Sequence, residues 1–131
     1  MNKSHNPEGW MRPKGYSNVV SATGTMVFVA GQIGWNAKEE FESDDFTDQT
    51  KQALSNIKDC LEAAGAKPAD IVRMTWYVID KQEYINNLDK VGAAYREVLG
   101  KNFPCMSLVQ VAGLVEPRAR LEIEVTAVIP N

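Results

Sequence analysis

The side chains that could do metal or nucleophilic chemistry are few in this 131-residue chain. It has one histidine, His5, and two cysteines, Cys60 and Cys105, which lie far apart and outside any Cys-x-x-Cys motif. Zinc sites need several closely spaced Cys or His ligands, and a Ser-His-Asp triad needs a histidine held within the fold. The sequence therefore predicts no zinc site, no such triad and no disulfide framework.

Carboxylates offer two further candidates. The acidic run Glu39–Asp45 could collect a metal ion, but a run of this kind is more often a solvated loop leading into a helix, which we expect here. Glu122 and Glu124 alternate with apolar residues near the C-terminus, so a strand would project both from one face.

Composition narrows the class of protein. The net charge is −3, and no two Lys or Arg residues are adjacent, so the basic surface of a nucleic-acid binder is not expected. No uncharged stretch is apolar enough to span a bilayer, and the N-terminus has no apolar signal segment. We expect a cytoplasmic protein without cofactor, metal or membrane partner.

Hydrophobic periodicity predicts the elements that must position any site. Apolar spacing of three and four residues predicts helices over Phe46–Ala64 and Lys81–Leu99, each followed by a glycine. Alternation predicts a hairpin of two strands with Thr23-Gly24 as its turn, and three later strands: Asn18–Ala22, Thr25–Ala30, Asp70–Asp80, Cys105–Ala112 and Arg120–Ile129.

The predicted order is ββαβαββ, an α+β fold in a single domain over residues 1–131. Right-handed crossovers would place both helices on one face of a mixed sheet. The other face would then carry residues such as Arg73, Tyr77 and Glu122 among apolar ones, with nothing in the chain to cover it. An open, half-apolar face favours self-association, so we expect a homo-oligomer whose sheets face one another.

Several segments together resemble the RidA family (reactive intermediate imine deaminases, also called L-PSP endoribonucleases or translation inhibitors). No single motif is specific, but the segments cover nearly the whole chain in the family's order: Gly15-Tyr16-Ser17, Phe28–Gly34, Ala53–Ile57, Leu61–Gly65, Ile71–Thr75, Phe103-Pro104 and Leu121–Val125. The resemblance implies a chorismate-mutase-like fold and a homotrimer with its sheets packed inside. It also implies clefts between subunits that hydrolyse enamines and imines to keto acids and ammonia.

The resemblance also implies site residues. Tyr16 matches a tyrosine that closes the cleft, Glu122 a glutamate that positions water or moves a proton, and Gly31 a glycine beside the pocket. The family's carboxylate-gripping arginine falls at Met106 and its pocket cysteine at Leu108. Methionine cannot hold a carboxylate, so the chain is similar to an arginine-less branch of the family, and its cleft floor should be more apolar. Gly92 likewise stands where many members have a polar side chain.

Other residues could complete a ligand site. Trp35, like Trp10 and Met11, is a large apolar residue in a predicted loop, where such residues line ligands or pack on a neighbouring subunit. We hypothesise that one of three arginines near the N-terminal segment and the last loop replaces the missing cation: Arg12, Arg118 or Arg120.

Three functions are compatible with these residues. The first is a homotrimer that binds a small molecule, less acidic and more apolar than a 2-imino acid, in its inter-subunit clefts. The second is an active enamine or imine deaminase that uses Glu122 and a substitute cation. The third is a non-catalytic binding or regulatory trimer whose cleft is vestigial.

Overall fold

The computed structural model describes residues 2–131, so Met1, where the expected domain begins, lies outside the described residues. The elements in chain order are β1 (Lys3–His5), β2 (Val19–Ser21), β3 (Gly24–Ile33), α1 (Phe46–Ala63), a 3-10 turn (Pro68–Asp70), β4 (Ile71–Val78), α2 (Lys81–Ile85), α3 (Leu88–Leu99), β5 (Cys105–Gln110) and β6 (Leu121–Pro130).

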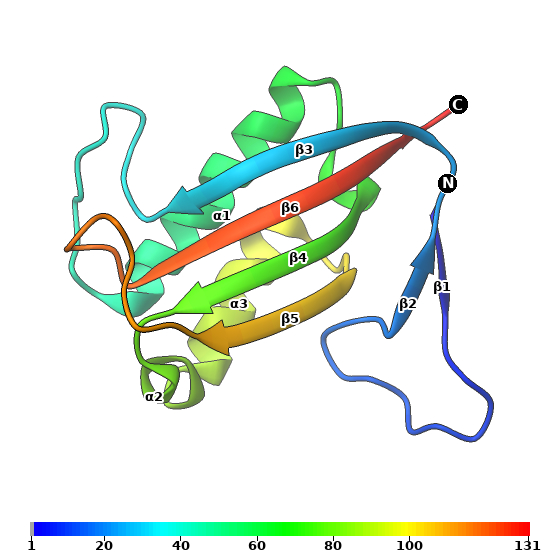
Figure 1. Ribbon diagram of the computed structural model, residues 1–131, viewed down its shortest axis with the longest axis horizontal. Helices are drawn as coiled ribbons and strands as arrows, with labels where there is room; N and C mark the ends of the chain where they lie inside the picture. Colours follow the sequence, from blue (N-terminus) through cyan, green and yellow to red (C-terminus); the bar gives the residue numbers. More distant parts are fainter. Residues whose placement is uncertain (1) are drawn as a thin grey trace.

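The main sheet has four strands in the order β3-β6-β4-β5. β6 is antiparallel to both β3 and β4, whereas β4 and β5 are parallel. The long helices α1 and α3 lie side by side behind this sheet (Figure 1). The predicted α+β class, a mixed sheet with its helices on one face, is confirmed.

Strand alternation and helix periodicity build the core on the helix side of the sheet. Met74, Trp76 and Val78 of β4 point toward the helices and are buried, as are alternate residues of β6 from Leu121 to Ala127. From α1, Leu54 and Ile57 are fully buried against them. The helix starts where Asp45 accepts a hydrogen bond from the Asp48 amide at 3.0 Å, so the acidic run leads into a helix as expected.

The predicted hairpin between the first two strands is wrong. β2 pairs instead with β1, a strand that the sequence did not predict, in a separate two-stranded sheet. β3 pairs with β6 along its length, which offers a far longer ladder than the three-residue β2 could. At Gly24 the chain presses so closely on Ile129 that a Cβ atom would collide with its carbonyl, and β2 diverges from the sheet there (Figure 1).

The second predicted helix is also interrupted. It forms as α2 and α3 with a break at Asn86-Asn87. The Asn87 side chain donates to the Glu83 carbonyl at 2.6 Å, a local bond that competes with continuous helix. Residues on both sides of the break, Tyr84 of α2 and Leu88 of α3, line one cavity together with β4 and β5.

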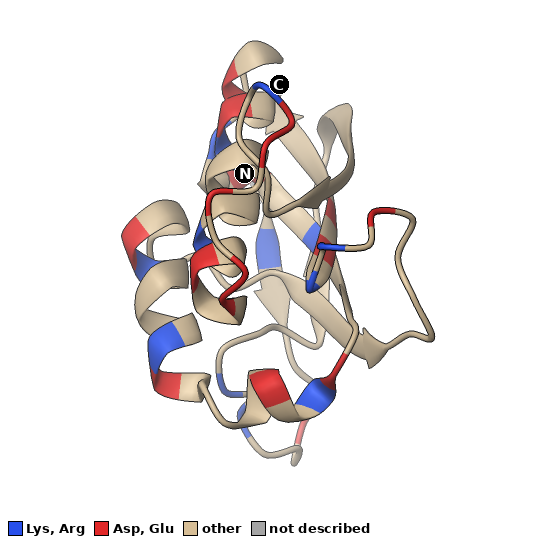
Figure 2. Cartoon of the chain, turned by 90° about the vertical axis from the view of Figure 1, so that its left-hand side faces the viewer, with Lys and Arg blue, Asp and Glu red and all other residues tan. Residues whose placement is uncertain are grey.

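The opposite face of the sheet, which we call the open face, has no helix over it. Large apolar residues remain exposed there, with Phe28 73% and Met26 57% accessible. Figure 2 shows Lys and Arg interspersed with Asp and Glu over the helices, with no stripe of one sign along them. No helix among residues 2–131 combines the length and apolarity needed to cross a membrane.

Candidate functional site

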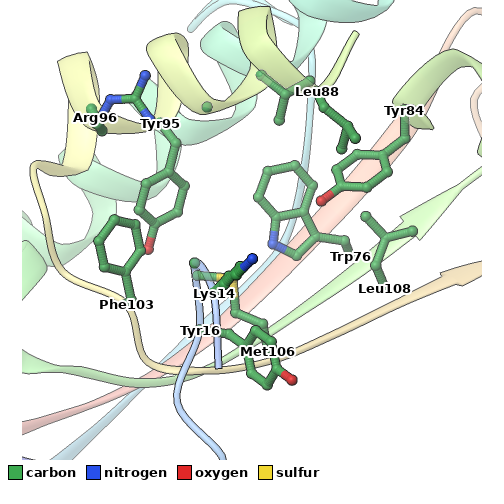
Figure 3. A pocket seen from close by; sticks show the side chains of 13 residues that line it. Lys14, Tyr16, Trp76, Tyr84, Leu88, Tyr95, Arg96, Phe103, Met106 and Leu108 are labelled. Carbon is green, nitrogen blue, oxygen red and sulfur yellow. The ribbon is translucent and has the colours of Figure 1, made fainter. Parts of the chain in front are cut away.

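A cavity of about 460 Å³ lies on the helix side of the sheet, between α2, α3, β4, β5 and the N-terminal segment. This volume is in the range of small-molecule sites. Figure 3 shows the side chains that surround it. They are Lys14, Tyr16, Trp76, Tyr84, Leu88, Val91, Tyr95, Arg96, Phe103, Met106 and Leu108, together with Gly15 and Gly92.

The floor of the cavity comes from two parallel strands. Trp76 of β4 is in register with Leu108 of β5, and Met74 with Met106, so alternate side chains of both strands share the helix side. Tyr84 of α2 packs edge-on against Trp76, with ring centroids 6.3 Å apart. Met106 and Leu108 therefore line one cavity, and their side chains make its floor apolar.

The indole nitrogen of Trp76 is the exception to this apolar floor. Trp76 is only 4% exposed, yet its Nε1 atom has no hydrogen-bond partner, which is true of no other buried side-chain nitrogen or oxygen in residues 2–131. Buried polar groups are nearly always paired, so an orphaned donor beside a cavity needs a partner from outside the chain. The alternation of apolar residues in β4 places Trp76 on an apolar strand face and gives no sign of this unpaired donor.

One wall is aromatic. Tyr95 of α3 stacks on Phe103 with centroids 5.7 Å apart and planes inclined by 14°. Burial raises the pKa of Tyr95 far above its usual value of 10.0, and its hydroxyl donates to the Asn102 carbonyl. The phenol is therefore neutral and already engaged, which makes it a wall rather than an acid–base group.

The N-terminal segment forms the mouth. Ser17 anchors it: its amide donates to the Pro104 carbonyl at 3.0 Å and its hydroxyl to the Phe103 carbonyl at 2.6 Å. Tyr16, 40% exposed, stands beside Met106, with its hydroxyl directed away from Trp76 (Figure 3). The position is consistent with a lid, whereas the hydroxyl does not point into the cavity.

Glu122 and Gly31 lie elsewhere, on the open face. The Glu122 side chain covers Gly31 so closely that a Cβ atom there would be 2.7 Å from the Glu122 Cδ, so only glycine fits without displacing the carboxylate. In register, Glu122 neighbours Tyr77 of β4, and Tyr77 neighbours Val109 of β5. Glu122 is thus two strand spacings, about 10 Å, from β5 and on the opposite side of the sheet from the cavity.

The remaining candidates do not line this cavity. Trp35 packs on Phe41 with centroids 5.8 Å apart, and its carbonyl accepts from Asn56 at 2.7 Å. Arg12 is exposed and borders a neighbouring hollow of the N-terminal segment. Arg118 pairs with Asp44 at 2.9 Å and Arg120 with Glu83 at 2.6 Å. The two latter arginines are already occupied within the subunit.

Two cations that the sequence reasoning missed do line the cavity. They are Lys14 and Arg96, and neither takes part in the three ion pairs formed within residues 2–131. Arg96 follows Gly92 by one helical turn, so its position beside a residue that departs from the family pattern was the signal available. Across residues 2–131, no three His, Cys, Asp or Glu side chains cluster as metal ligands would.

Known proteins resemble this chain over nearly all of its length. Residues 11–129 match the profile of the family described as Endoribonuclease L-PSP. The 2-iminobutanoate/2-iminopropanoate deaminase of Salmonella typhimurium is 37% identical over 108 residues, 80% of each chain. The crystal structure of YyfB, a Rid-family protein from Yersinia pestis, superposes with a TM-score of 0.83 at 35% identity over 98% of both chains.

A structure of E. coli TdcF with bound serine is also similar, with a TM-score of 0.68, 33% identity and coverage of 92% of this chain and 91% of that one. Family profile, sequence relatives and fold agree on one assignment. The chain belongs to the Endoribonuclease L-PSP family, also called the RidA family.

Proposed function

We propose that the protein, as a single-domain homotrimer, binds a small molecule in clefts between subunits, and that the cavity is the half of each cleft that one subunit supplies. The observation that carries this is the division of the site between the two sides of the sheet. Met106 and Leu108 line the cavity, whereas Glu122 and Gly31 lie on the open face. A carboxylate from the open face can meet a cavity only if a second copy brings it there.

The open face itself supports association. Phe28 and Met26 are exposed on it, beside a hollow that includes Arg73 and Glu124. Contacts of mixed apolar and charged character are typical of interfaces between subunits. Neither the net charge of −3 nor the scattered basic residues favours nucleic acid as the partner, so a second copy of the chain is the better occupant.

The apolar floor defines the ligand in part. Met106 and Leu108 stand where the family resemblance implies an arginine and a cysteine, so the ligand should have a larger apolar portion than a short 2-imino acid. The deaminase from Salmonella typhimurium, by its name, acts on 2-iminobutanoate and 2-iminopropanoate. We place this chain in an arginine-less branch that shares the scaffold and takes a different ligand.

Deamination is the second candidate, favoured by the family relatives named for it. Water would add across the C=N bond to give a carbinolamine, whose nitrogen would take up a proton. The C–N bond would then break as the hydroxyl loses its proton, giving a ketone and ammonia. Glu122 of a neighbouring subunit could carry the proton. A non-catalytic binding or regulatory trimer is the third possibility, and it shares the cavity but not the proton transfer.

A coupled assay separates these functions. An amino-acid oxidase generates 2-imino acids, semicarbazide traps those that survive, and native protein is compared with Glu122→Gln and Met106→Arg. Loss of trapped imine with native protein, abolished in Glu122→Gln, would establish deamination with another cation in place of the arginine. Activity gained only in Met106→Arg would establish a cleft adapted to another ligand. If all three proteins are inert and none binds a small molecule, the proposal of a ligand cleft fails.

A further inference from the structure

The indole N–H of Trp76 borders the cavity and has no hydrogen-bond partner. A tryptophan N–H can only donate, so its missing partner must be an acceptor oxygen or nitrogen. In Figure 3 the nitrogen points toward the side of the cavity where Lys14 lies. The lysine ammonium is also donor-only, and it forms no ion pair within residues 2–131. Two donors on one side of a cavity, neither of them paired within residues 2–131, favour an anionic ligand group.

Gly92 and Arg96 add a second positive group by a specific packing arrangement. A Cβ atom at Gly92 would lie 3.1 Å from a terminal nitrogen of Arg96, so the guanidinium rests over the space that a side chain at position 92 would fill. Arg96 is one helical turn further along α3 and borders the same cavity. Glycine at position 92 therefore leaves open a space beside the cavity, and the Arg96 guanidinium lies over this space.

The rest of the lining is apolar and largely aromatic. Trp76, Tyr84 and the stacked pair of Tyr95 and Phe103 present ring faces and edges, and Met106 and Leu108 complete the floor. Flat apolar groups pack well between such side chains. The cavity volume of about 460 Å³ accommodates one aromatic ring with a short chain.

We propose that this cavity binds an organic anion with a flat apolar body, such as an aromatic carboxylate, through Lys14 and the Trp76 N–H, with Arg96 on the opposite side of the cavity as a second positive charge (Figure 3). This rests on the proposed function, because it takes the cavity to be the ligand cleft. It differs from the sequence-based expectation of a less acidic ligand, which followed from Met106 alone. The positive charge comes from α3 and the N-terminal segment instead of β5. Charged hydrogen bonds to a carboxylate in a partly dry cavity give both affinity and orientation.

The test uses three probes and the indole N–H resonances of the native protein. 3-Phenylpropanoate carries the ring and the charge, 3-phenylpropanamide carries the ring without the charge, and propanoate carries the charge without the ring. Trp76→Phe identifies the Trp76 resonance among those of the three tryptophans. We expect 3-phenylpropanoate to shift that resonance saturably and to bind at least about tenfold more tightly than either of the other probes.

Variants test the two cations. Lys14→Gln should weaken 3-phenylpropanoate binding by about tenfold and Arg96→Gln by about two- to threefold, and both should leave amide binding nearly unchanged. Lys90→Gln is the matched control, because Lys90 is an exposed cation on the same helix that does not line the cavity. Equal binding of acid and amide, an unmoved Trp76 resonance, or equal losses in Arg96→Gln and Lys90→Gln would overturn the proposal.

The two proposals can fail separately. Binding of 3-phenylpropanoate needs no turnover and no proton transfer, so it is measured independently of the deamination assay. A protein that binds the acid as expected but is monomeric would contradict the shared cleft and leave the anion site standing. A trimer that binds the amide as well as the acid would do the reverse.

Discussion

The two faces of the β-sheet are built from the same strands but differ in what covers them. On the helix side, Met74, Val78 and Leu121 are completely buried by α1 and α3. On the open face, Phe28 is 73% exposed and the Tyr77 hydroxyl donates to Glu124 at 2.6 Å. The helix side is therefore covered within a single chain, whereas the open face leaves large apolar side chains exposed.

The candidate site follows the same division. The cavity belongs to the helix side, where packing by one chain fixes Trp76, Tyr95 and Phe103. Glu122 and Gly31 belong to the open face. Under the proposed function, the cavity and the Glu122 carboxylate lie in parts of the molecule that only association would join.

Substitutions at buried and at exposed positions should differ most in their effect on the free energy of unfolding. Ile57 is fully buried in α1, so Ile57→Ala removes apolar contacts and leaves a cavity that costs about 2–5 kcal/mol of unfolding free energy. Val115, 96% exposed, is the control, and Val115→Ala should change it by less than about 0.5 kcal/mol. Chemical denaturation measures both. Similar losses in the two variants would show that the helix side is not a tightly packed core.

Two glycines compare the faces at the level of one methyl group. A Cβ atom at Gly34 would come within 2.7 Å of the Gln49 Cα, and Gln49 is buried with hydrogen bonds to the chain around Arg118 and Arg120. Gly34→Ala must therefore push α1 from the sheet, at a cost of about 1–3 kcal/mol. Gly31→Ala displaces only the Glu122 side chain and should cost less than about 1 kcal/mol.

Denaturation midpoints measure how much stability each substitution costs, and ligand binding or turnover measures its effect on the site. Gly31→Ala should impair whatever Glu122 does, and Gly31→Ala combined with Glu122→Ala should show no further loss beyond Glu122→Ala alone. A Gly31→Ala variant less stable than Gly34→Ala would reverse the comparison.

Alkaline titration sharpens the contrast between the faces. Burial raises the pKa of Tyr95, whereas the hydrogen bond to Glu124 is the main cause that raises the pKa of Tyr77. Glu124→Gln should therefore lower the pKa of Tyr77 and leave Tyr95 unchanged. Tyrosinate absorbance, assigned with Tyr77→Phe and Tyr95→Phe, measures this. A shift of Tyr95 in Glu124→Gln would show that the two faces are electrostatically linked.

The same shifts make stability depend on pH. Each tyrosine has a folded pKa above its ordinary value of 10.0, so the folded state binds more protons than the unfolded state between the two pKa values. The stabilisation is complete below pH about 10 and decreases as the pH rises beyond it. Tyr95→Phe should reduce this alkaline loss, and an unchanged pH slope would contradict the assignment.

The sequence predicted the main sheet because its signals are local. The alternation in β4 and β6 and the apolar stripe of α1 each identify a buried face without knowledge of the partner. The pairing of β2 was predicted wrongly because Thr23-Gly24 is a plausible turn, and only the competition for β6 decides against it. The break at Asn87 depends on one side-chain hydrogen bond within a helical pattern.

The site was predictable in part for a related reason. Met106 and Leu108 were found through the family resemblance, and one strand places both in the cavity. Lys14, Trp76 and Arg96 come from three separate elements, so no spacing in the sequence brings them together. The positions of Trp35 and Arg12 relative to a neighbouring subunit stay predictions, because that subunit would supply the other half of the cleft.

The most direct test of the divided site is the molar mass of the native protein in solution by light scattering, compared with Phe28→Asp. We expect native protein at about three times the chain mass of 14.5 kDa. Phe28→Asp, which puts a charge on the open face away from the core, should give single folded chains without the Glu122-dependent activity. Native protein at the mass of one chain would contradict the account, because Glu122 could then never reach the cavity.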